Sequence, residues 1–257
     1  MSRFESLFSL PRTLIFDGGM GTMLQAHGMP AGMSPEAFCL ERADILYAVH
    51  KQYVQSGSDI ITTCTFGASP FKLDKGLSVF ETNKRLAEVA RKAADEAGRC
   101  VLVAGDVGPT GHFARPLGDV DPEELMAGLE EQVRGLAAGG CDCILLETQF
   151  DLAETRLGAA AVRTVCDLPI LASMTFEDAA SLTGSTPEIF AETMQNLGVA
   201  ALGTNCSVGP ERMAEILRRL LAVSSVPVFA QPNAGMPELR GDKTVFPLDA
   251  EHFAQLT

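Results

Sequence analysis

Short, almost continuously hydrophobic runs recur along the chain, and each run ends in a polar or glycine residue. Because polar and apolar positions do not alternate within them, the runs are typical of parallel strands that are buried on both faces. The stretches between the runs are long enough to hold helices. We therefore predict a repeated strand–helix fold, with strands at residues 13–17, 59–66, 101–106, 143–148, 169–175, 201–206 and 227–233.

Amphipathic helices with recognisable starting residues lie between the predicted strands. Asp121 can cap a helix, Pro122 suits its first position, and Glu124 lies three positions after the cap. The apolar residues at helical spacing that follow are Leu125, Leu129, Val133 and Leu136. These residues predict one buried face, and the glycine pair at 139–140 is expected to end the helix.

Two further helices are predicted from the same kind of start. Thr186 caps the first of them before Pro187. The apolar residues expected on its buried side are Phe190, Met194 and Leu197. Asp249 caps the last helix, which would carry Phe253 and Leu256 on its apolar side.

The polar residues at the strand ends distinguish an open doubly wound sheet from a (β/α)8 barrel. An open sheet gathers such residues at one switch point, whereas a barrel rings them around one mouth. Nearly every predicted strand ends in such a residue, and the set is Asp17, Thr65, Asp106, Glu147, Thr175, Cys206 and Asn233. We therefore predict an α/β fold of the TIM-barrel type. No linker interrupts the pattern, so residues 1–257 are expected to form one barrel domain.

The predicted strands number one fewer than a closed barrel requires. The chain ends at Thr257, inside the helix predicted to follow the last strand. We therefore expect a barrel that is truncated before its eighth strand, in a fragment of a longer polypeptide.

Charge and composition exclude several classes of protein. The net charge is −13, with 33 acidic and 20 basic residues, which is the opposite of the balance in a nucleic-acid-binding protein. No apolar stretch approaches the ~18–20 residues of a membrane helix, and the first residues do not resemble a secretory signal. The cysteines number seven in a chain too long for a disulfide scaffold. We predict a cytoplasmic enzyme with reduced thiols.

Three residues at the predicted strand ends could carry chemistry. The thiol of Cys206 could be a metal ligand or a nucleophile, although a small packed side chain is an equally good interpretation. Asp17 and Glu147 could act as acid and base or bind an ammonium group, because burying an unpaired carboxylate is unfavourable. The alternative for both acids is a capping bond to loop amides. Of the other cysteines, Cys64 could line the mouth or simply pack.

Glycine-rich loops follow three of the predicted strands. The run at residues 17–22 lacks the lysine and the spacing of a phosphate loop. Its glycines could instead let backbone amides approach a small ligand, such as a carboxylate near a helix N-terminus. Similar turns occur at residues 106–111 and 231–235. Ordinary turn chemistry explains each of them alone, and only their convergence suggests a site.

Six segments, in order along the chain, resemble the homocysteine S-methyltransferase family. They are FDGGMGTMLQ (16–25), ITTCTFGAS (61–69), GDVGPTG (105–111), LLETQFD (145–151), GTNCSVGPE (203–211) and QPNAG (231–235). Within the family, DGGMGT and ETQFD are most similar to the N-terminal homocysteine-binding module of cobalamin-dependent methionine synthase. The resemblance implies a (β/α)8 barrel and the transfer of a methyl group to homocysteine to form methionine.

The resemblance also implies a zinc site and a substrate site. Zinc would be held by three cysteine thiolates, of which Cys206 is one, and two further cysteine ligands are expected beyond Thr257. Glu147 would hold the substrate amino group, and Asp17 matches the acid of the first motif. The residues implied to lie near the substrate carboxylate are Gly18, Gly19, Asn233 and Ala234.

The methyl donor implied by the resemblance is methylcobalamin, carried on a separate module. The implied partners are homocysteine and the cobalamin-binding and folate-binding modules of a longer or split methionine synthase, without nucleic acid or membrane. Two alternatives stay open. One is a free-standing methyltransferase that uses betaine or S-methylmethionine, and the other is a non-catalytic barrel that lacks a complete metal site.

Overall fold

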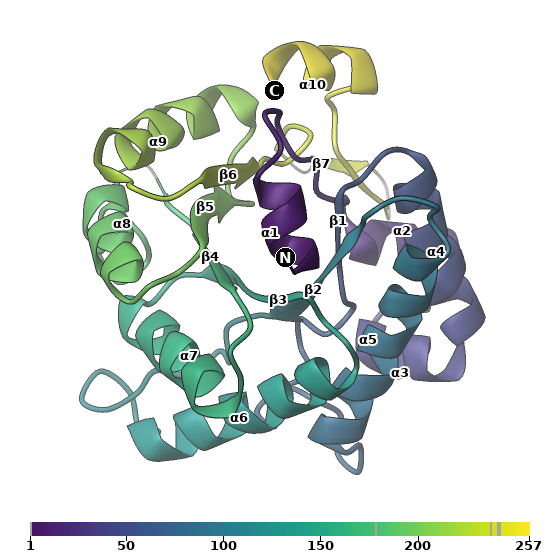
Figure 1. The fold of residues 1–257 in the computed structure, drawn as a ribbon, viewed down its shortest axis with the longest axis horizontal. Helices are drawn as coiled ribbons and strands as arrows, with labels where there is room; N and C mark the ends of the chain where they lie inside the picture. The colour runs from purple at the N-terminus through teal and green to yellow at the C-terminus, as the bar shows by residue number, and fades with distance from the viewer. Residues whose placement is uncertain (1, 178, 237, 241–242) are drawn as a thin grey trace. The chain divides into compact units, whose positions relative to one another are not determined.

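The computed structural model describes residues 2–177, 179–236, 238–240 and 243–257 (Figure 1). The chain divides into two compact units. The first unit comprises Met1–Leu146 and Leu157–Ile170, and the second comprises Glu147–Arg156 and Leu171–Thr257. The strand order is β1-β2-β3-β4-β5-β6, with a separate pair β7-β8. No helix in the described ranges is both long enough and apolar enough to cross a membrane.

The first unit is built on parallel strands whose residues are almost all buried. These strands are β1 (Ile60–Thr62), β2 (Leu102–Val107) and the first four residues of β3 (Cys143–Gln149). Ile60 lies opposite Leu102, and Ala104 lies opposite Cys143. The helices are α1 (Arg3–Phe8), α2 (Met20–Ala26), α3 (Pro35–Glu41), α4 (Ala43–Gln55), α5 (Val79–Asp95) and α6 (Pro122–Ala138). Helix α5 packs against α4, α6 and β2.

The second unit continues the same pattern with the end of β3, β4 (Ile170–Met174), β5 (Ala201–Asn205) and β6 (Val228–Gln231). The pairs β4–β5 and β5–β6 are parallel. Helix α7 (Leu152–Val165) contributes residues to both units. The remaining elements are α8 (Pro187–Asn196), α9 (Pro210–Val223), β7 (Glu238–Arg240), β8 (Lys243–Val245) and α10 (Ala250–Leu256), and β7 pairs with β8 in antiparallel fashion.

The first predicted strand, at residues 13–17, is the main correction to the fold. It forms only an isolated parallel bridge between Phe16 and Ile60. The side chain of Asp59 takes part in the pairing instead, because its carboxylate accepts the Ile15 N–H at 3.0 Å and a bidentate bond from Arg12. The side chain of Ile15 is 52% exposed. The described residues therefore give six parallel-sheet strands with alternating helices, and a closed eight-stranded barrel is not confirmed.

The predicted helix starts are confirmed. Asp121 caps α6, Thr186 caps α8 and Asp249 caps α10, each by accepting a backbone N–H at its side chain. The predicted apolar face of α6 is buried throughout. The prediction that Leu197 is buried is wrong, because this residue is 41% exposed, and Leu256 on the apolar side of α10 is 43% exposed. Leu197 lies just past the end of α8, and the described residues of α10 include no buried side chain.

Candidate active site

Glu147 lies near the end of β3, directly after four buried residues. Its side chain is only partly exposed. Burial raises the pKa of its carboxyl to about 7, because the charged form loses its hydration there. A carboxyl with such a pKa can bind a cation or exchange a proton near neutral pH.

Thr148 follows Glu147 and has an unusual backbone conformation. Its φ is 56°, in the left-handed region that a β-branched residue rarely occupies. Its backbone N–H donates to Ser173 Oγ at 3.3 Å and to Asn205 Oδ1 at 3.2 Å. Its hydroxyl accepts a bond from Asn205 Nδ2 at 2.7 Å. These bonds hold the end of β3 in a strained turn, and strain of this kind concentrates at functional sites.

Cys206 occupies a second strained turn, at the end of β5. The φ values of Cys206 and Ser207 are 54° and 62°. The Cys206 N–H donates to the carbonyl oxygen of Gln231 at 3.0 Å, and the thiol accepts a bond from Asn205 Nδ2 at 3.4 Å. Cys206 is exposed. Cys206 is therefore an exposed residue on a strained backbone segment.

Asn205 joins the two turns, because its side chain bonds both Thr148 and Cys206. The structure thus brings the predicted residues Glu147 and Cys206 into one region of the second unit. Sequence reasoning missed Thr148, Ser173 and Asn205 as members of this region. The one available signal was polarity, since each of these residues ends a buried strand or lies within one.

The loop with Asn233 and Ala234 is tied to the Cys206 turn. The Asn233 N–H donates to the Val208 carbonyl at 3.2 Å, and the Leu248 N–H donates to the Ala234 carbonyl at 3.0 Å. The Gly235 N–H bonds within the loop. A substrate carboxylate would therefore have to use the Ala234 N–H or the Asn233 side chain, and this role stays a prediction.

Asp17, Gly18 and Gly19 lie in the first unit. Asp17 Oδ2 accepts the backbone N–H of Thr62 at 2.8 Å and the Thr62 hydroxyl at 3.1 Å. Tyr53 donates to the Gly19 carbonyl at 3.1 Å. Its hydroxyl lies 3.1 Å from the position that a Cβ on Gly18 would occupy. These contacts hold the loop, and the convergence of Asp17, Glu147 and Cys206 on one mouth stays a prediction.

The pKa of the Tyr53 hydroxyl is shifted by its surroundings beside this loop. Burial, together with the charge of Asp17, raises the pKa of the Tyr53 hydroxyl to about 12. The phenol therefore stays protonated and keeps donating to Gly19. This bond ties the glycine-rich loop to α4.

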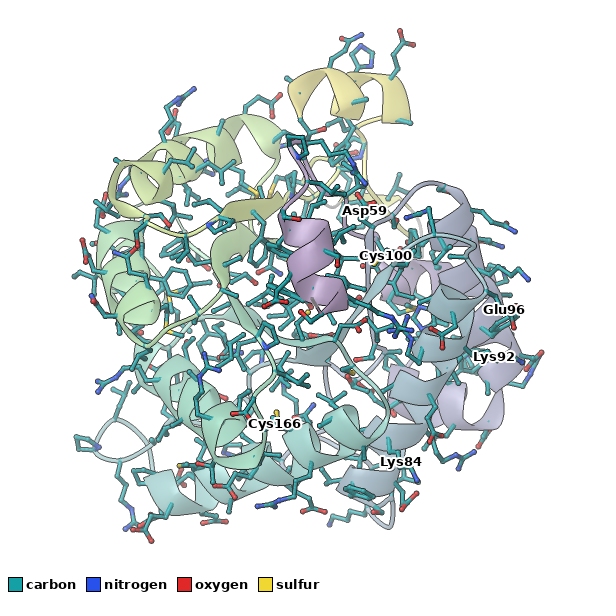
Figure 2. All side chains as sticks on the ribbon, viewed as in Figure 1. Asp59, Lys84, Lys92, Glu96, Cys100 and Cys166 are labelled. Atoms are coloured by element: carbon teal, nitrogen blue, oxygen red, sulfur yellow. The ribbon has the colours of Figure 1, made fainter. Side chains whose placement is uncertain are left out.

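The described residues contain no group of three histidine, cysteine or acidic side chains that could hold a metal ion. Burial raises the pKa of the thiols of Cys141 and Cys143, and Cys64 packs against Cys39 with 3.7 Å between sulfurs. Cys100 is exposed and Cys166 is partly exposed (Figure 2). A structural or catalytic zinc takes three or four protein ligands. The residues described here therefore do not form a complete zinc site around Cys206.

Comparison with known proteins gives a consistent result. A family model described as Homocysteine S-methyltransferase matches residues 14–257. The metallated form of homocysteine methyltransferase MmuM from Escherichia coli is 25% identical, with a TM-score of 0.80 over 91% of this chain and 88% of that chain. Its oxidised form is 24% identical, with a TM-score of 0.81 over 91% and 86%. The carboxyl transferase domain from Rhizobium etli pyruvate carboxylase, 11% identical, has a TM-score of 0.52 over 89% and 37% and is similar in fold alone.

Proposed function

Because the chain belongs to the homocysteine S-methyltransferase family, we propose that it binds homocysteine and presents the substrate sulfur for methylation, with Glu147 holding the substrate ammonium group. The observation that carries this proposal is the desolvated Glu147 carboxyl beside the strained Thr148 turn. An ammonium group would replace the hydration that this carboxyl has lost, and a charge-assisted bond of this type is stronger than a neutral one.

The reaction forms a carbon–sulfur bond and breaks the bond between the methyl group and its donor. The substrate thiol must lose its proton first, because the thiolate is the nucleophile and a free thiol has a pKa of roughly 8.5. We propose Cys206 as one ligand of the zinc that the family resemblance implies. The described residues do not complete that ligand set, so we assign no step of the reaction to the metal.

Methylcobalamin on a separate module is the donor that we propose, with cobalamin-binding and folate-binding modules as the partners. This choice rests on the similarity of the DGGMGT and ETQFD segments to the homocysteine-binding module of methionine synthase. Methylation assays with methylcobalamin, betaine and S-methylmethionine, run separately, distinguish the donors. Turnover with betaine or S-methylmethionine alone would contradict the proposed donor, and no turnover with any of the three would favour a non-catalytic barrel.

The substrate contact is tested by Glu147→Gln, which keeps the shape of the side chain and removes its charge. Charge-assisted bonds are worth roughly 1.5–3 kcal/mol, so the dissociation constant for homocysteine should rise by roughly 10- to 150-fold. Isothermal titration calorimetry measures this change. The matched control is Glu192→Gln, an exposed position on α8 in the same unit. Equal affinities for the wild type and Glu147→Gln would rule out the ammonium contact.

A further inference from the structure

We propose that Asn205 is a positioning residue that fixes the Glu147–Thr148 turn and the Cys206 turn in a single arrangement. This inference rests on the proposed function, because it assigns the arrangement to the recognition of one homocysteine molecule. The amino group of the substrate would be held on the β3 side and its sulfur on the β5 side. Asn205 would set the separation between the two contacts.

The side chain of Asn205 is 1% exposed, and all of its polar atoms are bonded within the second unit. Its Oδ1 accepts bonds from the Thr148 N–H at 3.2 Å and the Ser173 hydroxyl at 2.9 Å. Its Nδ2 donates to the Thr148 hydroxyl at 2.7 Å and to the Cys206 sulfur at 3.4 Å. The carboxamide can make four such bonds, so it has no capacity left for other partners.

The orientation of this carboxamide follows from its partners. A backbone N–H can only donate, so the atom that faces the Thr148 N–H must be the oxygen. The nitrogen must then face the Thr148 hydroxyl and the Cys206 sulfur, which can both accept. A flipped side chain would place two donors against each other. One side chain is therefore locked, and it connects β3, β4 and β5 through Thr148, Ser173 and Cys206.

The strain at both ends of this connection argues against a purely structural role. Thr148 and Cys206 each hold a positive φ that their side chains disfavour. Such conformations persist only where surrounding bonds determine them, and here the bonds of Asn205 reach both residues. If these strand ends served only the stability of the sheet, they could adopt ordinary backbone conformations without positive φ angles. The strained turns therefore indicate a geometry that is held for a ligand.

The functional test compares homocysteine with 4-mercaptobutanoate, which lacks only the amino group. Titration calorimetry at pH 8.5 is applied to the wild type, Asn205→Ala, Glu147→Gln and the double variant. Asn205→Ala should weaken the binding of homocysteine by about tenfold, because a small displacement of a group that contacts the substrate has a large effect on the interaction. It should change the affinity for 4-mercaptobutanoate by less than about twofold. In the double variant, Asn205→Ala should add almost nothing to the loss of homocysteine affinity caused by Glu147→Gln, since both changes act on the contact with the substrate ammonium group.

Conservative variants separate positioning from general damage. Asn205→Asp keeps an acceptor for the Thr148 N–H but removes the donor to the Cys206 sulfur, so the variant should lose about as much homocysteine affinity as Asn205→Ala does. If Asn205→Ala does not fold, Thr148→Ala replaces it, because this change removes one bond to Asn205. Thr148→Ser, which keeps the hydroxyl, should then restore the wild-type affinity.

A spectroscopic measurement tests the bridge itself. The side-chain amide of Asn205 gives two proton resonances in a nitrogen–proton correlation spectrum, which Asn205→Asp identifies by their loss. Cys206→Ala should move one of the two resonances, and Thr148→Ala should move the other. If Cys206→Ala leaves both unchanged, Asn205 does not bridge the two turns, and the inference is wrong.

The two proposals fail in different ways. An unchanged homocysteine affinity in Glu147→Gln would refute the proposed substrate contact and the inference with it. If Glu147→Gln loses homocysteine affinity but Asn205→Ala and Thr148→Ala do not, the proposed substrate contact stands and the positioning role alone is refuted. If Asn205→Ala loses equal affinity for homocysteine and for 4-mercaptobutanoate, the positioning role is also refuted, because such losses would indicate general damage to the site.

Discussion

At Glu147, burial places the pKa of the carboxyl at about 7, so its charge changes across the neutral range. Only the ionised form can pair with an ammonium group, and its fraction rises about tenfold between pH 6 and pH 8. The affinity for homocysteine should rise by the same factor in titration calorimetry over that range. The Glu147→Gln variant should show no such rise. A wild-type affinity that is flat with pH would contradict the raised pKa.

His50 gives a prediction for the pH dependence of stability. The ring is fully buried, and burial lowers its pKa to about 4. The unfolded state binds a proton near pH 6.5 and the folded state does not, so stability is lost as the pH falls from 6.5 towards 4. His50→Leu should remove this loss. Between pH 7 and pH 5 the wild type should lose about 2 kcal/mol more than His50→Leu in urea unfolding.

The comparison with a variant is necessary because Glu147 acts in the opposite direction. Its folded-state pKa lies above the unfolded value, so burial of its charge destabilises the protein above about pH 4.5 and this effect fades as the pH falls. The control for His50 is His27→Gln, an exposed position. If the wild type and His50→Leu lose stability in parallel, the buried ring is not the cause.

Individual site residues differ in how well the sequence predicts them. Glu147 and Cys206 could be located because each follows a hydrophobic run, and a polar residue at such a place is conspicuous. Thr148 and Asn205 could not, since a positive φ and a four-bond carboxamide depend on which strands become neighbours. The roles of Glu147, Cys206, Asp17, Gly18, Gly19, Asn233 and Ala234 come from the family resemblance and stay predictions.

At the level of elements, the start of α6 can be tested directly. The Asp121 side chain accepts the Glu123 N–H at 2.9 Å and so satisfies one of the free donors of the first turn. Asp121→Ala should destabilise the protein by about 1 kcal/mol in urea unfolding. The control is Asp119→Ala, which removes an acidic side chain two positions earlier and should change stability by less than about 0.5 kcal/mol. Equal effects would show that the cap contributes nothing specific.

Helices and strands were predictable to different degrees. Caps and periodicity are local properties, so the starts of α6, α8 and α10 follow from the sequence. The segment 13–17 has the composition of a buried strand, yet the Asp59 carboxylate takes one of its N–H groups. That competition involves residues far apart in the chain. The hairpin β7–β8 was not predicted, because its strands have only three residues each.

On the scale of the whole molecule, the two tyrosines provide a test of cooperativity. Tyr47 and Tyr53 both lie in the first unit, and the chain has no tryptophan. Tyrosine fluorescence therefore reports on the first unit, whereas far-ultraviolet circular dichroism reports on both. The strand β3 supplies residues to both units, so we expect the two signals to change at the same urea concentration. Separate midpoints would show that the units unfold independently.

The left-handed residues at 148, 206 and 207 have a consequence for any attempt to make this protein more heat-resistant. Glycine relieves strain at such positions, so a selection for thermal stability alone would favour glycine at Thr148 and Ser207. The same exchange at Thr148 removes the hydroxyl that Asn205 bonds. Variants improved in this way would tolerate heat at the expense of substrate affinity. A stabilising campaign should therefore leave these three positions unchanged.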